Sequence, residues 1–122
     1  MKTQILVVDD SAMARDLHAF MLRSGGYEVR AAGTGSEALE MLLNERFDLV
    51  VTDINMPRMD GLELTRRIRG TTGYRDTPVI LVSTEAEAQD RLEGLRAGAN
   101  VYVVKPARAA DLLLNARMLL GH

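Results

Sequence analysis

Several polar side chains stand at the ends of short apolar segments of the chain, and their types could do chemistry together. They are Asp9 and Asp10, Asp53, Ser83 and Thr84, and Lys105. Carboxylates that lie about 5 Å apart repel each other by about 3 kcal/mol per pair at an effective dielectric constant near 20. A fold that gathers the three aspartates therefore needs cations. Lys105 supplies one positive charge, and a divalent metal ion would supply the rest.

The oxygen-rich character of this set indicates which metal it would hold. The chain has no Cys, and no His stands near these segments, so the ligands on offer are oxygens. Oxygen ligands favour a hard cation, and few carboxylates with room for water and phosphate are typical of Mg²⁺. Mg²⁺ beside a carboxylate nucleophile, a lysine and a hydroxyl suits phosphoryl transfer through an aspartyl phosphate.

Each of these residues also has an ordinary structural role that it could fill by itself. Asp10 or Ser11 could cap a helix, Asp53 could begin a turn, and Lys105 could be a solvated charge. Chemistry requires that all of them meet at one place, and that depends on the elements that carry them.

The apolar segments are continuous and rich in β-branched residues, which is typical of strands covered on both faces in a parallel sheet. We predict strands at residues 5–8, 49–51, 79–82 and 101–104, and an edge strand at 27–32. Helical periodicity between them predicts helices at residues 11–23, 36–44, 61–69, 86–97 and 109–120. This alternation predicts an α/β fold with a doubly wound, five-stranded parallel sheet in the order 2-1-3-4-5. Ligands of such folds bind beyond the carboxyl ends of the strands, where the polar residues stand.

Composition limits the classes of protein to which the chain can belong. Its 122 residues predict one domain, residues 1–122, with no output domain after the fifth helix. A net charge of −2 gives no support for nucleic-acid binding, and no apolar run approaches the ~20 residues of a membrane helix. We therefore expect a cytoplasmic domain that neither inserts into membranes nor binds nucleic acid.

Five short segments combine into a specific pattern that runs through almost the whole chain. They are residues 7–11, 53–61, 78–83, 98–99 and 104–106. Together they resemble the response-regulator receiver domains of two-component signalling, and most closely the single-domain chemotaxis type. The resemblance implies the flavodoxin-like receiver fold.

The resemblance also implies a role for each site residue. Asp53 would accept the phosphoryl group from a phosphohistidine. Asp10, Asp53 and the backbone carbonyl of Asn55 would bind Mg²⁺ directly, and Asp9 would act largely through water. Lys105 would pair with one phosphoryl oxygen, its position fixed by a cis peptide bond to Pro106. Ser83 would hydrogen-bond another phosphoryl oxygen.

Further residues would respond to the phosphoryl group or control its lifetime. Tyr102 would be the aromatic residue that turns inward when Ser83 moves, and Asn55 and Glu85 would tune hydrolysis toward a short-lived phosphoryl group. Two positions depart from the family. Thr84 follows Ser83 where a small residue is more usual, and Ala107 stands where a bulky aromatic is common.

The function implied is that of a switch, not of an enzyme with an external substrate. It would take a phosphoryl group from a sensor histidine kinase or a histidine phosphotransfer protein, and would hydrolyse its own phosphate. Phosphorylation would change the surface of the fourth helix, fifth strand and fifth helix, which would contact a target protein or a second receiver. Leu114 and Met118 are candidates for an exposed apolar stripe there.

Other interpretations of the pattern stay open. The chain could be a receiver cut from a longer transcriptional or enzymatic response regulator, or a phosphorelay intermediate. A receiver-like binding module without phosphorylation would typically lack Asp53, one of the paired acids or Lys105, and all are present. A flavodoxin-like redox protein fits poorly, because Asp9 and Asp10 would repel a flavin phosphate. A small-molecule phosphohydrolase would be expected to carry a cap insertion.

Two residues have expected roles that depend on packing. We expect His18, in the middle of the first helix, to lie on the surface or partly buried and away from the strand ends. Gly94, inside the fourth helix, either weakens that helix as part of the switch or permits close packing.

Overall fold

The computed structural model describes residues 2–85 and 88–121, and strands and helices alternate along this part of the chain. The strands are β1 Gln4–Val8, β2 Glu28–Ala32, β3 Leu49–Asp53, β4 Val79–Ser83 and β5 Val101–Val104. The helices are α1 Ala12–Ser24, α2 Gly35–Asn44, α3 Gly61–Arg69, α4 Ala88–Ala97 and α5 Ala109–Leu120. The helix predicted at residues 86–97 is thus seen from Ala88, and residues 86 and 87 lie outside the described part.

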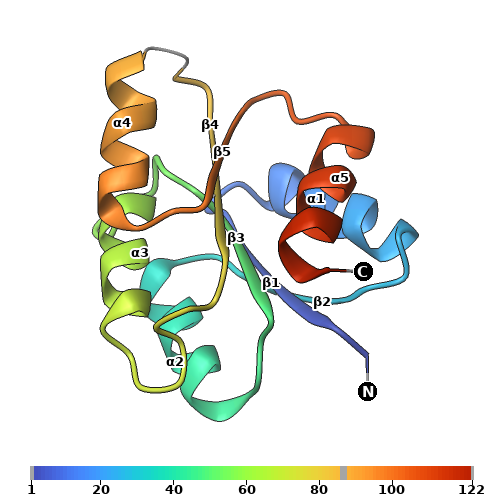
Figure 1. Ribbon diagram of the computed structural model, residues 1–122, viewed down its shortest axis with the longest axis horizontal. Helices are drawn as coiled ribbons and strands as arrows, with labels where there is room; N and C mark the ends of the chain where they lie inside the picture. The colour runs from blue at the N-terminus through green and yellow to red at the C-terminus, as the bar shows by residue number, and fades with distance from the viewer. Residues whose placement is uncertain (1, 86–87, 122) are drawn as a thin grey trace.

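The sheet has the predicted topology. Its order is β2-β1-β3-β4-β5, and each neighbouring pair is parallel. Figure 1 shows three layers, with α2, α3 and α4 on one face of the sheet and α1 and α5 on the other. Because the strands are parallel, the carboxyl ends of β1, β3, β4 and β5 meet at one edge.

The two faces of the sheet carry separate hydrophobic cores. Successive strand residues point to opposite faces, so Leu6 and Val50 pack with α2 and α3 while Ile5 and Val51 pack with α1 and α5. All five residues of β3 and of β4 are buried. This burial on both faces explains why the sequences of these strands are continuous apolar runs. It also anchors the strand ends that carry the functional residues.

Strand β3 extends beyond its apolar run and ends at Asp53, the residue expected at the strand end. The apolar run stops at Val51, but the ladder continues through Thr52 and Asp53, with Asp53 in register with Val82 of β4. Asp53 is therefore part of the sheet and not of the loop after it.

Gly94 permits close packing of α4 on the sheet. A Cβ atom there would stand 2.9 Å from Cδ1 of Leu81 and 3.1 Å from Cδ2 of Tyr102. Both distances are shorter than ordinary van der Waals contact, so the glycine lets α4 approach β4 and β5. Of the two roles considered for Gly94, the structure supports this one.

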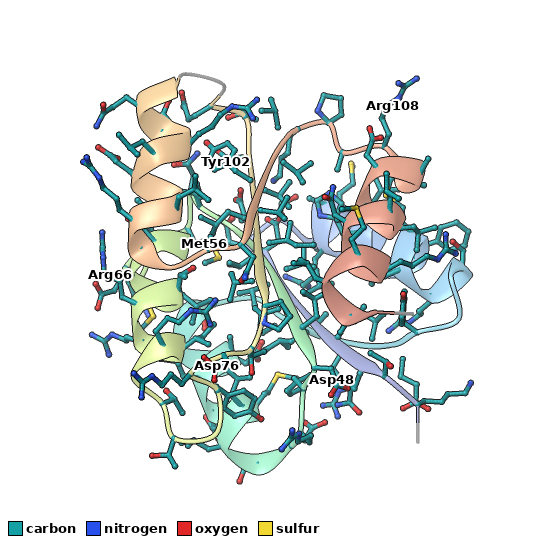
Figure 2. The ribbon with its side chains drawn as sticks, in the orientation of Figure 1. Asp48, Met56, Arg66, Asp76, Tyr102 and Arg108 are labelled. Atoms are coloured by element: carbon teal, nitrogen blue, oxygen red, sulfur yellow. The ribbon has the colours of Figure 1, made fainter. Side chains whose placement is uncertain are left out.

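The opposite edge of the sheet holds the loops that precede β3 and β4. Figure 2 shows Asp48 and Asp76 at that edge, far from Tyr102 and Arg108 near the other. Within the described ranges, no helix combines the length and apolar character that crossing a bilayer requires.

Candidate functional site

Backbone contacts hold the loop after β3 tightly against the strand end. The amide of Gly61 donates a hydrogen bond to the carbonyl of Ile54 over 2.8 Å. A Cβ at position 61 would collide with the carbonyl oxygen of Asp53. Asp60 caps α3 by accepting a hydrogen bond from the amide of Glu63. The start of α3 is thus packed directly on the backbone that presents Asp53.

Three carboxylates come together at the carboxyl edge of the sheet. Asp9 is 1% exposed and Asp53 is 7% exposed, whereas Asp10 is exposed to solvent. One oxygen from each lies within 4.8 Å of the others. The order of the strands explains the meeting, because β1 and β3 are neighbours and end side by side.

Lys105 crosses from the loop after β5 to reach this cluster. Its Nζ lies 3.1 Å from Oδ2 of Asp9 and 3.3 Å from Oδ1 of Asp53. The peptide bond that joins it to Pro106 is cis. The Lys105 amide donates a hydrogen bond to the carbonyl of Ser83 over 2.7 Å, which ties the β5–α5 loop to the end of β4.

The surroundings shift the protonation equilibria of the two central groups. Burial raises the pKa of Asp53, and the nearby charge of Lys105 offsets only part of that effect. Burial also lowers the pKa of Lys105, but its hydrogen bond to Asp9 and the charge of Asp53 outweigh this, so the Lys105 pKa is raised. Lys105 is therefore a cation at neutral pH, and the raised pKa of Asp53 reflects the poor solvation of its ionised form.

The donor set fits a magnesium ion by chemistry and by charge. The cluster offers oxygen atoms from Asp9, Asp10 and Asp53, and hard oxygen ligands are those that Mg²⁺ prefers. Three carboxylates against one ammonium leave two negative charges, which one divalent cation would neutralise. Asn55 is exposed in the loop directly after Asp53, where its backbone carbonyl could join the set.

The residues after β4 are organised by the Ser83 hydroxyl. Ser83 is fully buried, and its Oγ accepts a hydrogen bond from the amide of Glu85 over 3.1 Å. Thr84 and Glu85 themselves are exposed. The buried hydroxyl therefore connects the functional edge to the start of the β4–α4 loop.

Tyr102 holds the other side of that loop. Its hydroxyl donates a hydrogen bond to the carbonyl of Glu85 over 2.7 Å, and Figure 2 shows its side chain toward α4. The guanidinium of Arg91, on α4, stands 5.7 Å from the centre of the ring, within cation–π range. Ser83 and Tyr102 thus both hydrogen-bond to the backbone of Glu85. Ser83 bonds to its amide and Tyr102 to its carbonyl.

The prediction for His18 was wrong. The side chain is 4% exposed, and it lines a pocket beside Lys105 and Pro106 at the functional edge. Helical spacing could have found it, because Ala14 and His18 share one face of α1 with its N-cap residue Ser11, which adjoins the acidic pair. A histidine within an apolar helix face has no motif of its own, so the residue types alone did not single it out.

Comparison with known proteins agrees with this geometry. Residues 5–117 match the family model of the response regulator receiver domain. The chain is 41% identical over 120 residues to response regulator MprA of Mycobacterium tuberculosis. This alignment covers 98% of this chain and 51% of MprA. It is 36% identical over 115 residues to the gliding motility regulatory protein of Myxococcus xanthus, covering 94% of this chain and 15% of that protein.

A solved structure shows the same fold at full length. Chemotaxis protein CheY4 of Vibrio cholerae superposes with a TM-score of 0.93 at 35% identity, covering 98% of this chain and 100% of CheY4. The chain therefore spans about half the length of MprA, a smaller part of the gliding motility regulator, and the whole of CheY4.

Proposed function

The chain belongs to the response regulator receiver domain family, and from that premise we propose that it is a switch phosphorylated on Asp53. The observation that carries this proposal is the carboxylate of Asp53 itself. It is 7% exposed and stands at the end of β3, with Lys105 at 3.3 Å and two more carboxylates beside it. The donor would be a phosphohistidine on a sensor histidine kinase or a histidine phosphotransfer protein.

In the proposed transfer, an oxygen of Asp53 attacks the phosphorus atom of the donor. The P–N bond to the donor histidine breaks, and its electron pair stays on the imidazole nitrogen. Asp9, Asp10, Asp53 and the carbonyl of Asn55 would hold Mg²⁺, which when bound would supply positive charge to the phosphoryl oxygens. Lys105 would leave its carboxylate partners and pair with a phosphoryl oxygen.

We infer that the new phosphoryl group would be sensed through Ser83. It adds charge and three acceptor oxygens next to Ser83, whose hydroxyl would turn from Glu85 to donate to one of them. Thr84 and Glu85 would move with it, and Tyr102 would lose its partner at the Glu85 carbonyl and turn inward. Asn55 and Glu85 are both exposed, in the loops that follow β3 and β4, and would set the access of hydrolytic water.

The output would leave through the face made by α4, β5 and α5. Large apolar side chains are exposed on its two helices: Leu92, Leu95, Leu114 and Met118. These side chains would supply the apolar contacts of a protein-interaction surface. The partner would be a downstream target or a second receiver, and the proposed place of action is the cytoplasm. The chain would catalyse only its own phosphorylation and dephosphorylation.

The comparisons support two settings for this switch. Full coverage of CheY4 favours a regulator in which the receiver, residues 1–122, acts alone through protein contacts. Coverage of 51% of MprA favours a receiver that governs a further domain of a longer regulator, or that relays the phosphoryl group. Both settings need the same chemistry at Asp53.

The chemistry can be tested with a small phosphodonor. Incubation with acetyl phosphate and Mg²⁺ should add one phosphoryl group, measured by intact mass, to the wild type and to Asp111→Asn, a control at an exposed position on α5. Asp53→Asn should take none. Equal modification of Asp53→Asn would show that the phosphoacceptor lies elsewhere.

A further inference from the structure

A pocket that the phosphoryl-transfer proposal does not use lies between α1 and the β5–α5 loop. Its volume is about 400 Å³, within the range of roughly 300–1,000 Å³ that small-molecule sites occupy. The wall is mainly apolar, with methyl and aliphatic groups from both elements. The lining residues used below are Met13, Leu17, His18, Lys105, Pro106 and Ala107.

His18 is the one imidazole in this wall, and it has no hydrogen-bond partner among the described residues. The side chain is 4% exposed. No buried side-chain nitrogen or oxygen in the described part of the chain is closed off without a partner. The ring nitrogens of His18 must therefore reach solvent, and the pocket that the ring lines is their route. Water in the pocket can satisfy these nitrogens, and a ligand that displaces that water must offer His18 a hydrogen bond of its own.

The charges around the pocket select a neutral occupant. Lys105 is already paired with Asp9 and Asp53 at 3.1 and 3.3 Å, so it does not need an anionic ligand as a partner. Burial and the neighbouring charge of Lys105 lower the pKa of His18, so the imidazole is neutral at pH 7 and offers one donor and one acceptor nitrogen. An anion would lie beside the carboxylate cluster, and a cation beside Lys105.

The size of residue 107 leaves the space open. Ala107 is 8% exposed and lies at the pocket between the cis proline and α5. Phenylalanine at this position would add a benzyl group to the wall of the pocket and should reduce the space within it.

We propose that this pocket binds a compact, neutral aromatic molecule that carries a single hydroxyl or ring N–H group, with that group hydrogen-bonded to His18. Its ring would lie against Met13, Leu17 and Ala107. Binding of this ligand favours the conformation described here, in which Lys105 is paired with Asp9 and Asp53. A ligand that prefers one state opposes the other, so occupancy slows phosphorylation of Asp53. This second effect rests on the proposed function.

Phenol is the probe for binding, followed in ¹H–¹⁵N spectra of the labelled chain without metal or phosphodonor. Phenol should shift the amide signals of residues 11–18, Lys105 and Ala107, and benzoate at the same concentration should not. Ala107→Phe should weaken phenol binding at least ten-fold, whereas Leu114→Phe, the same ring placed on an exposed part of α5, should leave it unchanged.

His18→Val provides a second variant that keeps the pocket open. It should weaken phenol three- to ten-fold, the range expected for one lost hydrogen bond, and leave the affinity for toluene unchanged. Shifts that persist in Ala107→Phe, equal loss of phenol and toluene in His18→Val, or no shift in the wild type would overturn the proposed site.

The effect on phosphorylation is measured separately. Saturating phenol should slow modification by acetyl phosphate in the wild type and not in Ala107→Phe, and an unchanged wild-type rate would overturn the coupling. Asp53→Asn should bind phenol like the wild type. A failure of phosphorylation is therefore distinguishable from a failure of the pocket.

Discussion

At the scale of single residues, the site holds charged groups that it solvates poorly. Asp9 is buried, Asp53 is nearly buried, and their shared counter-charge is Lys105. Their poor solvation lowers the stability of the fold, but the same groups would bind the metal ion and the phosphoryl group. Loss of stability at a site of this kind is commonly the price of function.

Removing the charge of Asp53 should stabilise the folded chain in EDTA. Burial raises the pKa of Asp53 in the folded state, so its contribution to stability is present below the unfolded pKa and is lost as pH rises through the folded one. Asp53→Asn should therefore raise the melting temperature by several degrees at pH 7, and the difference should shrink as pH approaches 4. Thermal unfolding followed by circular dichroism checks this, and a destabilised variant at pH 7 would contradict it.

Replacing Lys105 should lower the stability of the folded chain while it raises the affinity for Mg²⁺. Lys105→Met leaves Asp9 and Asp53 without their ammonium partner, which should cost about 1.5–3 kcal/mol of unfolding free energy in EDTA. The same loss of positive charge should tighten Mg²⁺ binding several-fold by calorimetric titration. Lys2→Met, at an exposed position, should change neither quantity. Weaker Mg²⁺ binding in Lys105→Met would refute the competition between lysine and metal.

At the scale of elements, two glycines set how closely helices approach the functional edge. Gly61 brings α3 onto the Asp53 backbone, and Gly94 brings α4 onto Leu81 and Tyr102. In both places the constraint is the space for a Cβ atom. The helix propensity of glycine is a secondary matter there.

Gly61→Ala should reduce phosphorylation by acetyl phosphate at least ten-fold. The added Cβ would collide with the Asp53 carbonyl oxygen and push the nucleophile from its place. Gly70→Ala is the matched control, because its Cβ would lie no closer than 3.7 Å to the nearest atoms. Initial rates measured by intact mass compare the two. Equal rates would mean that the loop yields without moving Asp53.

Gly94→Ala should lower stability even though alanine is the better helix former. Propensity alone would favour alanine by about 1 kcal/mol, but the contacts at 2.9 and 3.1 Å require α4 to move outward. Overpacking of this kind costs about 1–3 kcal/mol. Urea unfolding should show a net loss for Gly94→Ala and none for Glu93→Ala, an exposed position on the same helix. A net gain in Gly94→Ala would restore the view of Gly94 as a weak point in the helix.

At the scale of the whole molecule, the sequence was most informative where burial is complete. The strands β1, β3 and β4 are covered on both faces, so their composition alone revealed them and their order followed from the alternation with helices. The end of β3 at Asp53 was expected, although Thr52 and Asp53 pair in the ladder without being apolar. The place of His18 could not be predicted from the residue types. It depends on the β5–α5 loop, which lies almost ninety residues further along the chain.

The proposed output face should be separable from the phosphorylation chemistry. Leu114 and Met118 are 56% and 72% exposed on α5, and substitutions at such exposed positions usually change stability by no more than about 0.5 kcal/mol. The double variant Leu114→Asp and Met118→Asp should keep the wild-type rate of modification by acetyl phosphate and the wild-type melting temperature. A slower rate would show that this face supports the site itself.

The separation of the two edges of the sheet makes the molecule convenient to handle as a reagent. The chain contains no cysteine, so one thiol introduced at exposed Thr72, in the loop before β4, would be unique. Coupled through that thiol to a sensor chip, every copy would present its phosphorylation edge to the flowing solution. Candidate kinases could then be ranked by binding in one orientation, with the surface chemistry held far from the contact.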